Sequence, residues 1–411
     1  MGHSHRASRD DDLPIGRAVR FSLLAALAVV AVLTIVGVIL LWPDSGKLDT
    51  IRRHTPFAAP GVTATTARVT QVAPACAGSK PAADGAGACG TIDVRVLDGV
   101  GTGDHAHVRV PPEVTASGLG SGDRVQLLRM PARQGQPVSY SFDSIDRTTP
   151  LLWLALGFVL VVVAVARLRG LMAILGLLFS ALTIYYFLLP ALLAGEPAIL
   201  TAAVSASAIM FVVLYSTHGP NLRTSTALAG TLVGIALTAG ISVLSIDGAH
   251  LTGIPDETAG MVSTFAAGLD FQGLLACGVI LAGLGVLNDV TITQASSVWE
   301  LRAASPDMSR RRLFVSAMRI GRDHIASTIY TIAFAYAGAS LAVLMLLTIY
   351  HRPLMQLISS ESLAEEIART LVTSIGLILA VPITTAIATL VTSAARPGRR
   401  AGPLQPVYDD E

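Results

Sequence analysis

Residues 285–301, GVLNDVTITQASSVWEL, place charged and polar side chains at the end of an apolar run of the kind that crosses membranes. On a helix, residues three and four apart share a side. The side chains aligned in this way are those of Asp289, Thr293, Ser296 and Glu300, with Asn288 and Ser297 beside them. A carboxylate that faces lipid at the bilayer centre costs about 3 kcal/mol. We therefore expect the stripe to face a bundle interior, a partner or water.

Two interpretations of this stripe stay open. Ser and Thr side chains join membrane helices by hydrogen bonds, which would make the stripe a structural polar seam. Two carboxylates are more than a seam needs, and intramembrane carboxylates mark ion and proton paths. The predicted transport path consists of Asp289, Thr293, Ser296, Ser297, Glu300, Arg322 and Asp323.

Composition assigns the chain to the polytopic α-helical membrane proteins. Of its 411 residues 52% are hydrophobic and only 14% are charged, and the mean hydropathy is +0.62, so the predicted environment is a lipid bilayer. The formal net charge of +1 argues against a nucleic-acid partner. Small residues such as Gly230 and Gly234 predict close approach of helix backbones.

Apolar runs predict about eight transmembrane helices, each long enough to cross ~30 Å of hydrocarbon. They lie at 20–42, 150–167, 171–193, 198–216, 225–246, 271–292, 327–350 and 370–393. With a cytoplasmic N-terminus, the short inside segments hold sixteen Lys and Arg residues, and the short outside loops hold only Arg352 and Arg369. This asymmetry predicts that both termini are cytoplasmic and that residues 43–149 lie outside.

The resulting division has five parts: a disordered cytoplasmic tail (1–19), a transmembrane anchor (20–42), an extracytoplasmic β-rich domain (43–149), a seven-helix transmembrane domain (150–393) and a cytoplasmic tail (394–411). Five runs of alternating apolar and polar residues predict the strands of the β-rich domain, at 62–72, 91–98, 105–110, 123–129 and 138–145. Such a set favours a small antiparallel barrel or sandwich, of which an OB-like barrel is one form.

The three cysteines are Cys76, Cys89 and Cys277. The first two flank an Ala/Gly/Ser-rich loop on the predicted oxidising side, which favours a disulfide over a metal pair. Cys277 lies in an apolar span and is interpreted as a packing residue. Because neither the cysteines nor the histidines form a ligand set, we expect no metal and no cofactor.

The outside loop 247–270 carries acids and no Lys or Arg. Asp256, Glu257 and Asp270 would attract cations to an outer vestibule, although an ordinary solvated loop with incidental acids is the favoured interpretation. After Glu300, either Asp307 or Ser309 can cap a basic amphipathic helix lying on the inner leaflet. The polar residues that then precede the next span are expected partners of Asp289 and Glu300: Arg319, Arg322, Asp323 and His324.

Two of these motifs resemble the YibE/F family of bacterial membrane proteins. The first falls on Asp289-Val290, Ser296-Ser297 and Glu300, and the second on Gly321-Arg322-Asp323, Ser327-Thr328, Ala335-Tyr336 and Gly338. The resemblance covers about 42–393 and implies a β-rich segment outside the bacterial cytoplasmic membrane, followed by a seven-span body. It implies no reaction, because the family is described only in terms of transport or membrane location.

Two functions from different classes follow. The first is a secondary transporter or exporter for a cation or small solute. Because the chain has no P-loop, such transport would be driven by an ion gradient or by a separate motor subunit. The alternative is an envelope assembly or scaffold protein whose external domain binds a partner; a homo-oligomer is compatible with both. The chain contains neither H-E-x-x-H nor G-x-S-x-G, so we do not expect an enzyme.

Overall fold

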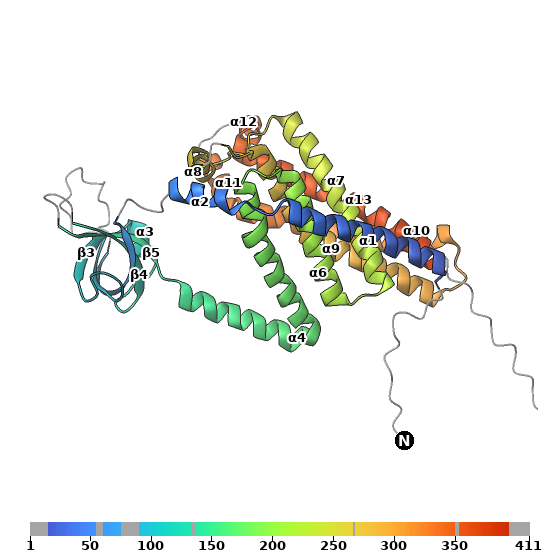
Figure 1. The fold of residues 1–411 in the computed structure, drawn as a ribbon, viewed down its shortest axis with the longest axis horizontal. Helices are drawn as coiled ribbons and strands as arrows, with labels where there is room; N and C mark the ends of the chain where they lie inside the picture. Colours follow the sequence, from blue (N-terminus) through green and yellow to red (C-terminus); the bar gives the residue numbers. More distant parts are fainter. Residues whose placement is uncertain are drawn as a thin grey trace, which may run out of the picture. The chain divides into compact units, whose positions relative to one another are not determined.

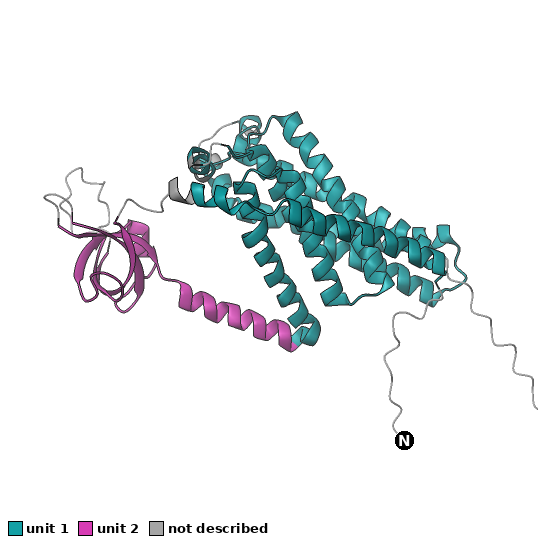
Figure 2. Ribbon diagram, viewed as in Figure 1, with its two compact units in different colours: residues 1–51, 165–411 teal, residues 52–164 magenta. Residues whose placement is uncertain are grey.

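The computed structural model describes residues 15–54, 61–74, 90–132, 137–265, 268–349 and 353–393. It divides the chain into two compact units, one made of residues 1–51 and 165–411 and the other of residues 52–164 (Figure 2). The predicted disulfide between Cys76 and Cys89 lies outside the described residues, as do residues 1–14 and 394–411 of the two tails.

The first unit is helical throughout its described part, and α4 continues from it into the second unit (Figure 1). Its elements are α1 (Arg17–Leu40), α2 (Ser45–His54), α4 (Thr148–Thr183), the π-helix η1 (Ile184–Leu188), α5 (Leu189–Leu193), α6 (Ala198–His218), α7 (Leu222–Ala249), α8 (Glu257–Phe265), α9 (Phe271–Ala304), α10 (Arg310–Ala339), α11 (Leu341–Ile349), α12 (Leu354–Ile358) and α13 (Glu361–Ser393).

Helices α7, α9 and α13 pack on one another and form the centre of the helical unit. Glycines on α7 allow this packing, because a Cβ at Gly230 would collide with Thr384, and one at Gly234 would collide with Leu287. The close approach predicted from these two glycines is confirmed. Small residues let membrane helices gain dispersion contacts where burial from water contributes nothing.

Two buried clusters fix the direction of these helices. Near the C-terminal end of α9, Val298 packs with Leu313 of α10 and Val391 of α13. Near its N-terminal end, Leu275 packs with Ile246 of α7 and with the first turns of α13. Helices α9 and α13 therefore run in the same direction, and α7 and α10 run in the opposite direction.

Six described helices are long and apolar enough to cross a membrane by length and composition, so the expected count of eight is not confirmed. Two expected spans fall in the single stretch Thr148–Leu193, where the backbone breaks at Arg167 (φ 52°, ψ −131°). The expected span 327–350 falls partly on α10 and partly on α11. The basic amphipathic helix is the first half of α10 and not a separate element, because no residue at 323–326 stops a helix.

The second unit contains a curled antiparallel sheet, a half-barrel, and the five strands predicted from alternation are all present. They are β1 (Thr63–Ala73), β2 (Thr91–Val96), β3 (His105–Arg109), β4 (Arg124–Met130) and β5 (Ser139–Ile145), with the short helix α3 (Pro112–Ala116) between β3 and β4. The order β3-β2-β1-β4-β5 makes the first four strands a Greek key. The sheet curls until its edge strands β3 and β5 contact each other, which excludes the sandwich for the described residues.

The half-barrel has its own hydrophobic core. Alternate residues of the strands point inward, including Val69, Ile92, Val108, Val125 and Leu127. The other face of the sheet carries exposed polar and charged side chains. This period-two pattern is what allowed the strands to be predicted from the sequence.

Candidate functional site

The predicted stripe lies on α9 but does not face the centre of the bundle. Asp289 is 67% exposed, Glu300 is exposed, and Thr293, Ser296 and Ser297 are half-buried. The inward side of α9 is formed instead by Leu287, Thr291, Gln294, Val298 and their neighbours. The stripe was expected to face the bundle interior, a partner or water. The structure excludes the bundle interior, so a partner or water remains.

Asp289 nevertheless sits at the level of the middle of the bundle. Leu287, two residues before it, lies beside Gly234 and Ala380, which are close to the midpoints of α7 and α13. The expected span ended at 292, near Asp289, whereas α9 continues to Ala304. A carboxylate at this depth cannot face hydrocarbon without the cost given above.

Helix α10 supplies a polar neighbour of Asp289, the imidazole of His324. Nε2 of His324 lies 3.5 Å from Oδ2 of Asp289, and the His324 side chain is 30% exposed. His324 was among the expected partners, and the structure brings this pair together. Arg322 and Asp323 are exposed on other sides of α10, and within the described ranges no ion pair joins either one to Asp289 or Glu300.

A hydrogen-bonded polar seam does cross the bundle, but through residues that were not predicted. Thr291 and Thr231 share a hydrogen bond of 2.6 Å between their hydroxyls. Nε2 of Gln294 donates to the carbonyl of Ala317 (3.0 Å) and to Oγ1 of Thr385 (2.8 Å). The seam joins α9 to α7, α10 and α13. Its sequence signal is the 4-3-4 spacing of 287, 291, 294 and 298, which combines apolar and polar residues.

The stripe itself takes little part in that seam. The Ser297 hydroxyl donates to the carbonyl of Thr293 within α9 (2.9 Å). Of the site residues predicted on α9, all of which the structure describes, only Asp289 has a polar side-chain contact with another helix, the one to His324. The hydrogen bonds that join α9 to its neighbouring helices are thus made by other residues, and the stripe remains available to solvent, ions or a partner.

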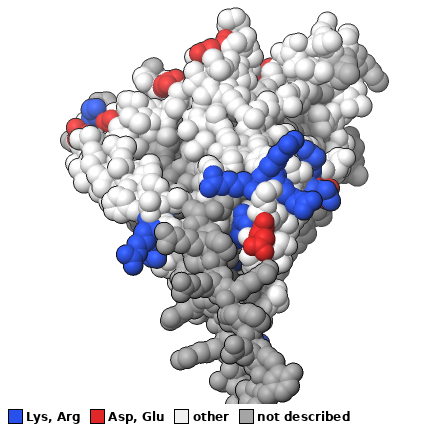
Figure 3. Space-filling view, turned by 90° about the vertical axis from the view of Figure 1, so that its right-hand side faces the viewer, with Lys and Arg blue, Asp and Glu red and all other residues white. Residues whose placement is uncertain are grey.

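Arginines gather at the end of the helical unit where α10 begins. Figure 3 shows basic side chains clustered on this face, and Arg310, Arg311 and Arg312 are exposed in the first turn of α10. The side chain of Ser309 caps the helix by accepting from the Arg312 amide, as predicted. Arg302 is buried instead and donates to the carbonyls of Pro306 and Met308 (both 2.8 Å), which holds the α9–α10 turn.

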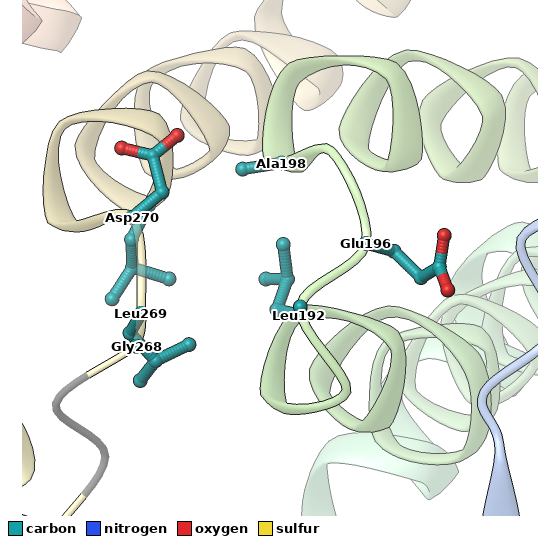
Figure 4. A pocket seen from close by; sticks show the side chains of 8 residues that line it. Leu192, Glu196, Ala198, Gly268, Leu269 and Asp270 are labelled. Carbon is teal, nitrogen blue, oxygen red and sulfur yellow. The ribbon is translucent and has the colours of Figure 1, made fainter. Parts of the chain in front are cut away.

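The acids predicted for an outer vestibule are occupied as helix caps. Asp256 accepts from the Ala259 amide at the start of α8 (2.9 Å), and Asp270 accepts from the Gly273 amide at the start of α9 (2.8 Å). Asp270 and Glu196 border a small pocket, where their carboxylates point away from each other (Figure 4). Glu257 begins α8, and its side chain lies outside the described part.

A second acidic group, missed by the sequence reasoning, lies at the start of α13. Glu361 accepts from the amide and hydroxyl of Thr252 (2.5 and 2.9 Å). Glu365, one turn later, is 3% exposed, and its Oε1 has no hydrogen-bond partner among the described residues. In the sequence, the only feature that marks Glu365 is its place on one side of a helix between two charged residues, Glu361 four positions before it and Arg369 four positions after it.

Cys277 is buried and free, as its interpretation as a packing residue predicted. Among the residues that the structure describes, no three His, Cys, Asp or Glu side chains are grouped so that they could hold a metal ion.

A family model described as YibE/F-like protein matches residues 154–394, more than half of the chain. The match contains Asp289, His324 and the central helices, and it begins after the half-barrel. No curated protein and no solved structure matches the chain.

Proposed function

The chain belongs to the YibE/F-like protein family, and on that premise we propose that it is a secondary transporter or exporter of a small cation or of protons. The observation that carries the proposal is the Asp289 carboxylate, 67% exposed and 3.5 Å from His324. Ionisable groups at mid-depth among membrane helices are retained where a path for ions or protons needs them.

The chemistry of the pair fits this role. An imidazole and a carboxylate can each take up and release a proton, and both can bind cations. A pair of this kind binds a proton or a cation and releases it when the surroundings change. Thr293, Ser296, Ser297 and Glu300 extend the path along α9 toward the arginine-rich end, and Arg322 and Asp323 would flank it.

The proposed location is the bacterial cytoplasmic membrane, with several passes, both termini cytoplasmic and residues 43–149 outside. The Lys and Arg distribution in the short loops supports this orientation. Both described acids of the proposed outer vestibule, Asp256 and Asp270, cap helices, so the vestibule is a minor part of the proposal. We propose no enzymatic step, no cofactor and no resident metal.

The half-barrel favours a second candidate function, that of an envelope scaffold. It is a unit with its own core, and its Greek-key order is that of an OB-like barrel, a fold whose exposed strands and loops bind ligands. On this alternative, the helical unit is a platform, alone or as a homo-oligomer, and the half-barrel binds an envelope partner.

A complementation experiment separates the two functions. A deletion strain is grown across a panel of metals, salts and pH values with wild type, with Asp289→Asn, with the control Asp143→Asn in the half-barrel, or with residues 62–145 deleted. Cell ion content is measured. The transporter predicts an ion-specific defect rescued by wild type and Asp143→Asn but not by Asp289→Asn. Full rescue by Asp289→Asn, with failure of the deletion alone, supports the scaffold instead.

A further inference from the structure

Four basic residues lie side by side across four strands of the half-barrel. Arg68 on β1 is directly opposite Arg95 on β2 and Arg124 on β4, and Arg95 is directly opposite His105 on β3. All four side chains are exposed. Directly paired residues project from the same face of a sheet with Cβ atoms about 5 Å apart, so these side chains form one continuous basic row.

The row is not balanced by acids of the sheet. Asp93, the nearest acid on β2, is engaged by His107 at 2.8 Å, and Asp98 accepts from the Thr66 amide. Asp146 lies near Arg124, but in the described part of the chain no ion pair reaches Arg68 or Arg95. Like charges placed directly opposite each other destabilise a sheet, so the pairing of Arg68 with Arg95 has a folding cost that no described ion pair offsets.

The connections of the half-barrel keep it next to a bilayer. Its last strand ends at Ile145, and α4, whose first arm is apolar, begins at Thr148 after only two residues. Extended chain spans at most about 3.5 Å per residue, so β5 ends within roughly 10 Å of the start of α4. If α4 enters the membrane, the half-barrel lies beside the headgroup layer, where phosphates are the abundant anions.

We propose that Arg68, Arg95 and Arg124, together with His105, dock the outer face of the half-barrel onto the phosphate groups of anionic phospholipids. Guanidinium groups bind phosphate through two parallel hydrogen bonds, and a row of them matches a surface of headgroups better than a single anion. This inference does not depend on the proposed transport, because it holds equally for a scaffold.

The test uses the full-length chain in nanodiscs, with Cys76, Cys89 and Cys277 replaced. An environment-sensitive fluorophore is attached at Thr70→Cys, an exposed position next to the row, and quenching by headgroup-labelled lipid reports docking. The variant R68Q/R95Q/R124Q is compared with the control R310Q/R311Q/R312Q, which loses the same charge from α10. Thermal unfolding confirms that each variant is folded. If the Gln triple is unfolded, the variant R68K/R95K/R124K takes its place, because it keeps the charge but removes the paired guanidinium hydrogen bonds to phosphate.

In discs with phosphatidylglycerol, we expect strong quenching that falls by about tenfold or more in the Gln triple and at high salt, but not in the control. Neutral discs should give little quenching. Equal quenching in neutral and anionic discs would overturn the proposal, as would quenching that is unchanged in a folded Gln triple. A spectral response to inorganic phosphate in neutral discs, as large as the response to anionic lipid, would also overturn it by identifying a free-anion site.

Discussion

The carboxylate of Asp289 on α9 lies 3.5 Å from Nε2 of His324 on α10. Asp289 is 18 residues after Phe271 and 15 before Ala304, and His324 is similarly central in α10. Two antiparallel helices thus bring an acid and an imidazole together at the mid-level of the bundle. Lipid alone would leave the exposed carboxylate unsolvated, which is why we propose that water, an ion or a partner reaches this level.

Replacement of His324 by Gln should reduce transport by about tenfold or more, equivalent to about 1.4 kcal/mol in the barrier, because it removes the titratable neighbour of Asp289. The protein should insert and accumulate normally, since His324 is only half-buried. The measurement is the flux rate in proteoliposomes. Arg311→Gln, exposed in the first turn of the same helix and outside the proposed path, is the control and should retain the flux. Equal losses in both variants would point to a general effect on α10.

Two glycines predict opposite outcomes for the same substitution. Gly230→Ala should lower the free energy of unfolding by about 1–3 kcal/mol, because its Cβ would collide with Thr384. Gly285→Ala should leave it unchanged or raise it by up to about 1 kcal/mol, because nothing lies within 4 Å and Ala favours a helix. Unfolding in detergent followed by Trp fluorescence measures both. A stable Gly230→Ala variant would contradict the packing of α7 on α13.

Asp98 should make the half-barrel sensitive to acid. The Thr66 amide, which donates at 2.6 Å, lowers the pKa of Asp98 below its ordinary 3.8, and the Thr65 hydroxyl adds to this effect. Because the pKa of Asp98 is lower in the folded state than in the unfolded chain, the ionised carboxylate stabilises the folded state. This stabilisation is fully present above pH 3.8 and is lost as the pH falls through the pKa of the folded state.

Asp98→Asn should therefore cost about 1 kcal/mol at neutral pH, a small value for a charge-assisted bond because the group is exposed. The difference from wild type should shrink below about pH 4. Urea unfolding followed by circular dichroism across this pH range measures it. A difference that stays constant with pH would rule out the ionised carboxylate as the cause.

The orientation can be tested with single cysteines in a cysteine-free chain. Ser121→Cys in the half-barrel should react with a membrane-impermeant thiol reagent in intact cells, because Ser121 is exposed and its unit is proposed to lie outside. Ser205→Cys should stay unreactive, because Ser205 is fully buried in α6. Labelling of Ser121→Cys only after cell lysis would reverse the orientation.

The half-barrel was predictable because alternation is a local signal. The five strands agree with the predicted runs to within two residues at each end, since each buried residue such as Val94 is flanked by polar or exposed ones. The curling of the sheet and the cross-strand row at Arg68 depend on register, which alternation within one strand does not specify.

The sequence placed the polar stripe on one side of α9 but did not specify the direction in which that side faces. Spacing placed Asp289 and Glu300 on one side of a helix, but it could not tell which side faces α7 and α13. That choice depends on the fit of Leu287 beside Gly234 and on the bonds of Gln294, which join segments far apart in the chain. The division between the expected spans 150–167 and 171–193 coincides with the break at Arg167, whereas the expected span 327–350 is divided between α10 and α11, which hydropathy did not signal.

The central claim is that Asp289 lies on a transport path, and flux in proteoliposomes tests it most directly. Purified wild type and Asp289→Asn are reconstituted at equal density, with Glu300→Gln as a second acid variant, and proton and metal fluxes are recorded under imposed gradients. The account predicts gradient-driven flux through wild type that falls to the level of empty liposomes in Asp289→Asn. Equal flux through wild type and a folded Asp289→Asn, or no flux through wild type with any ion tested, would contradict it.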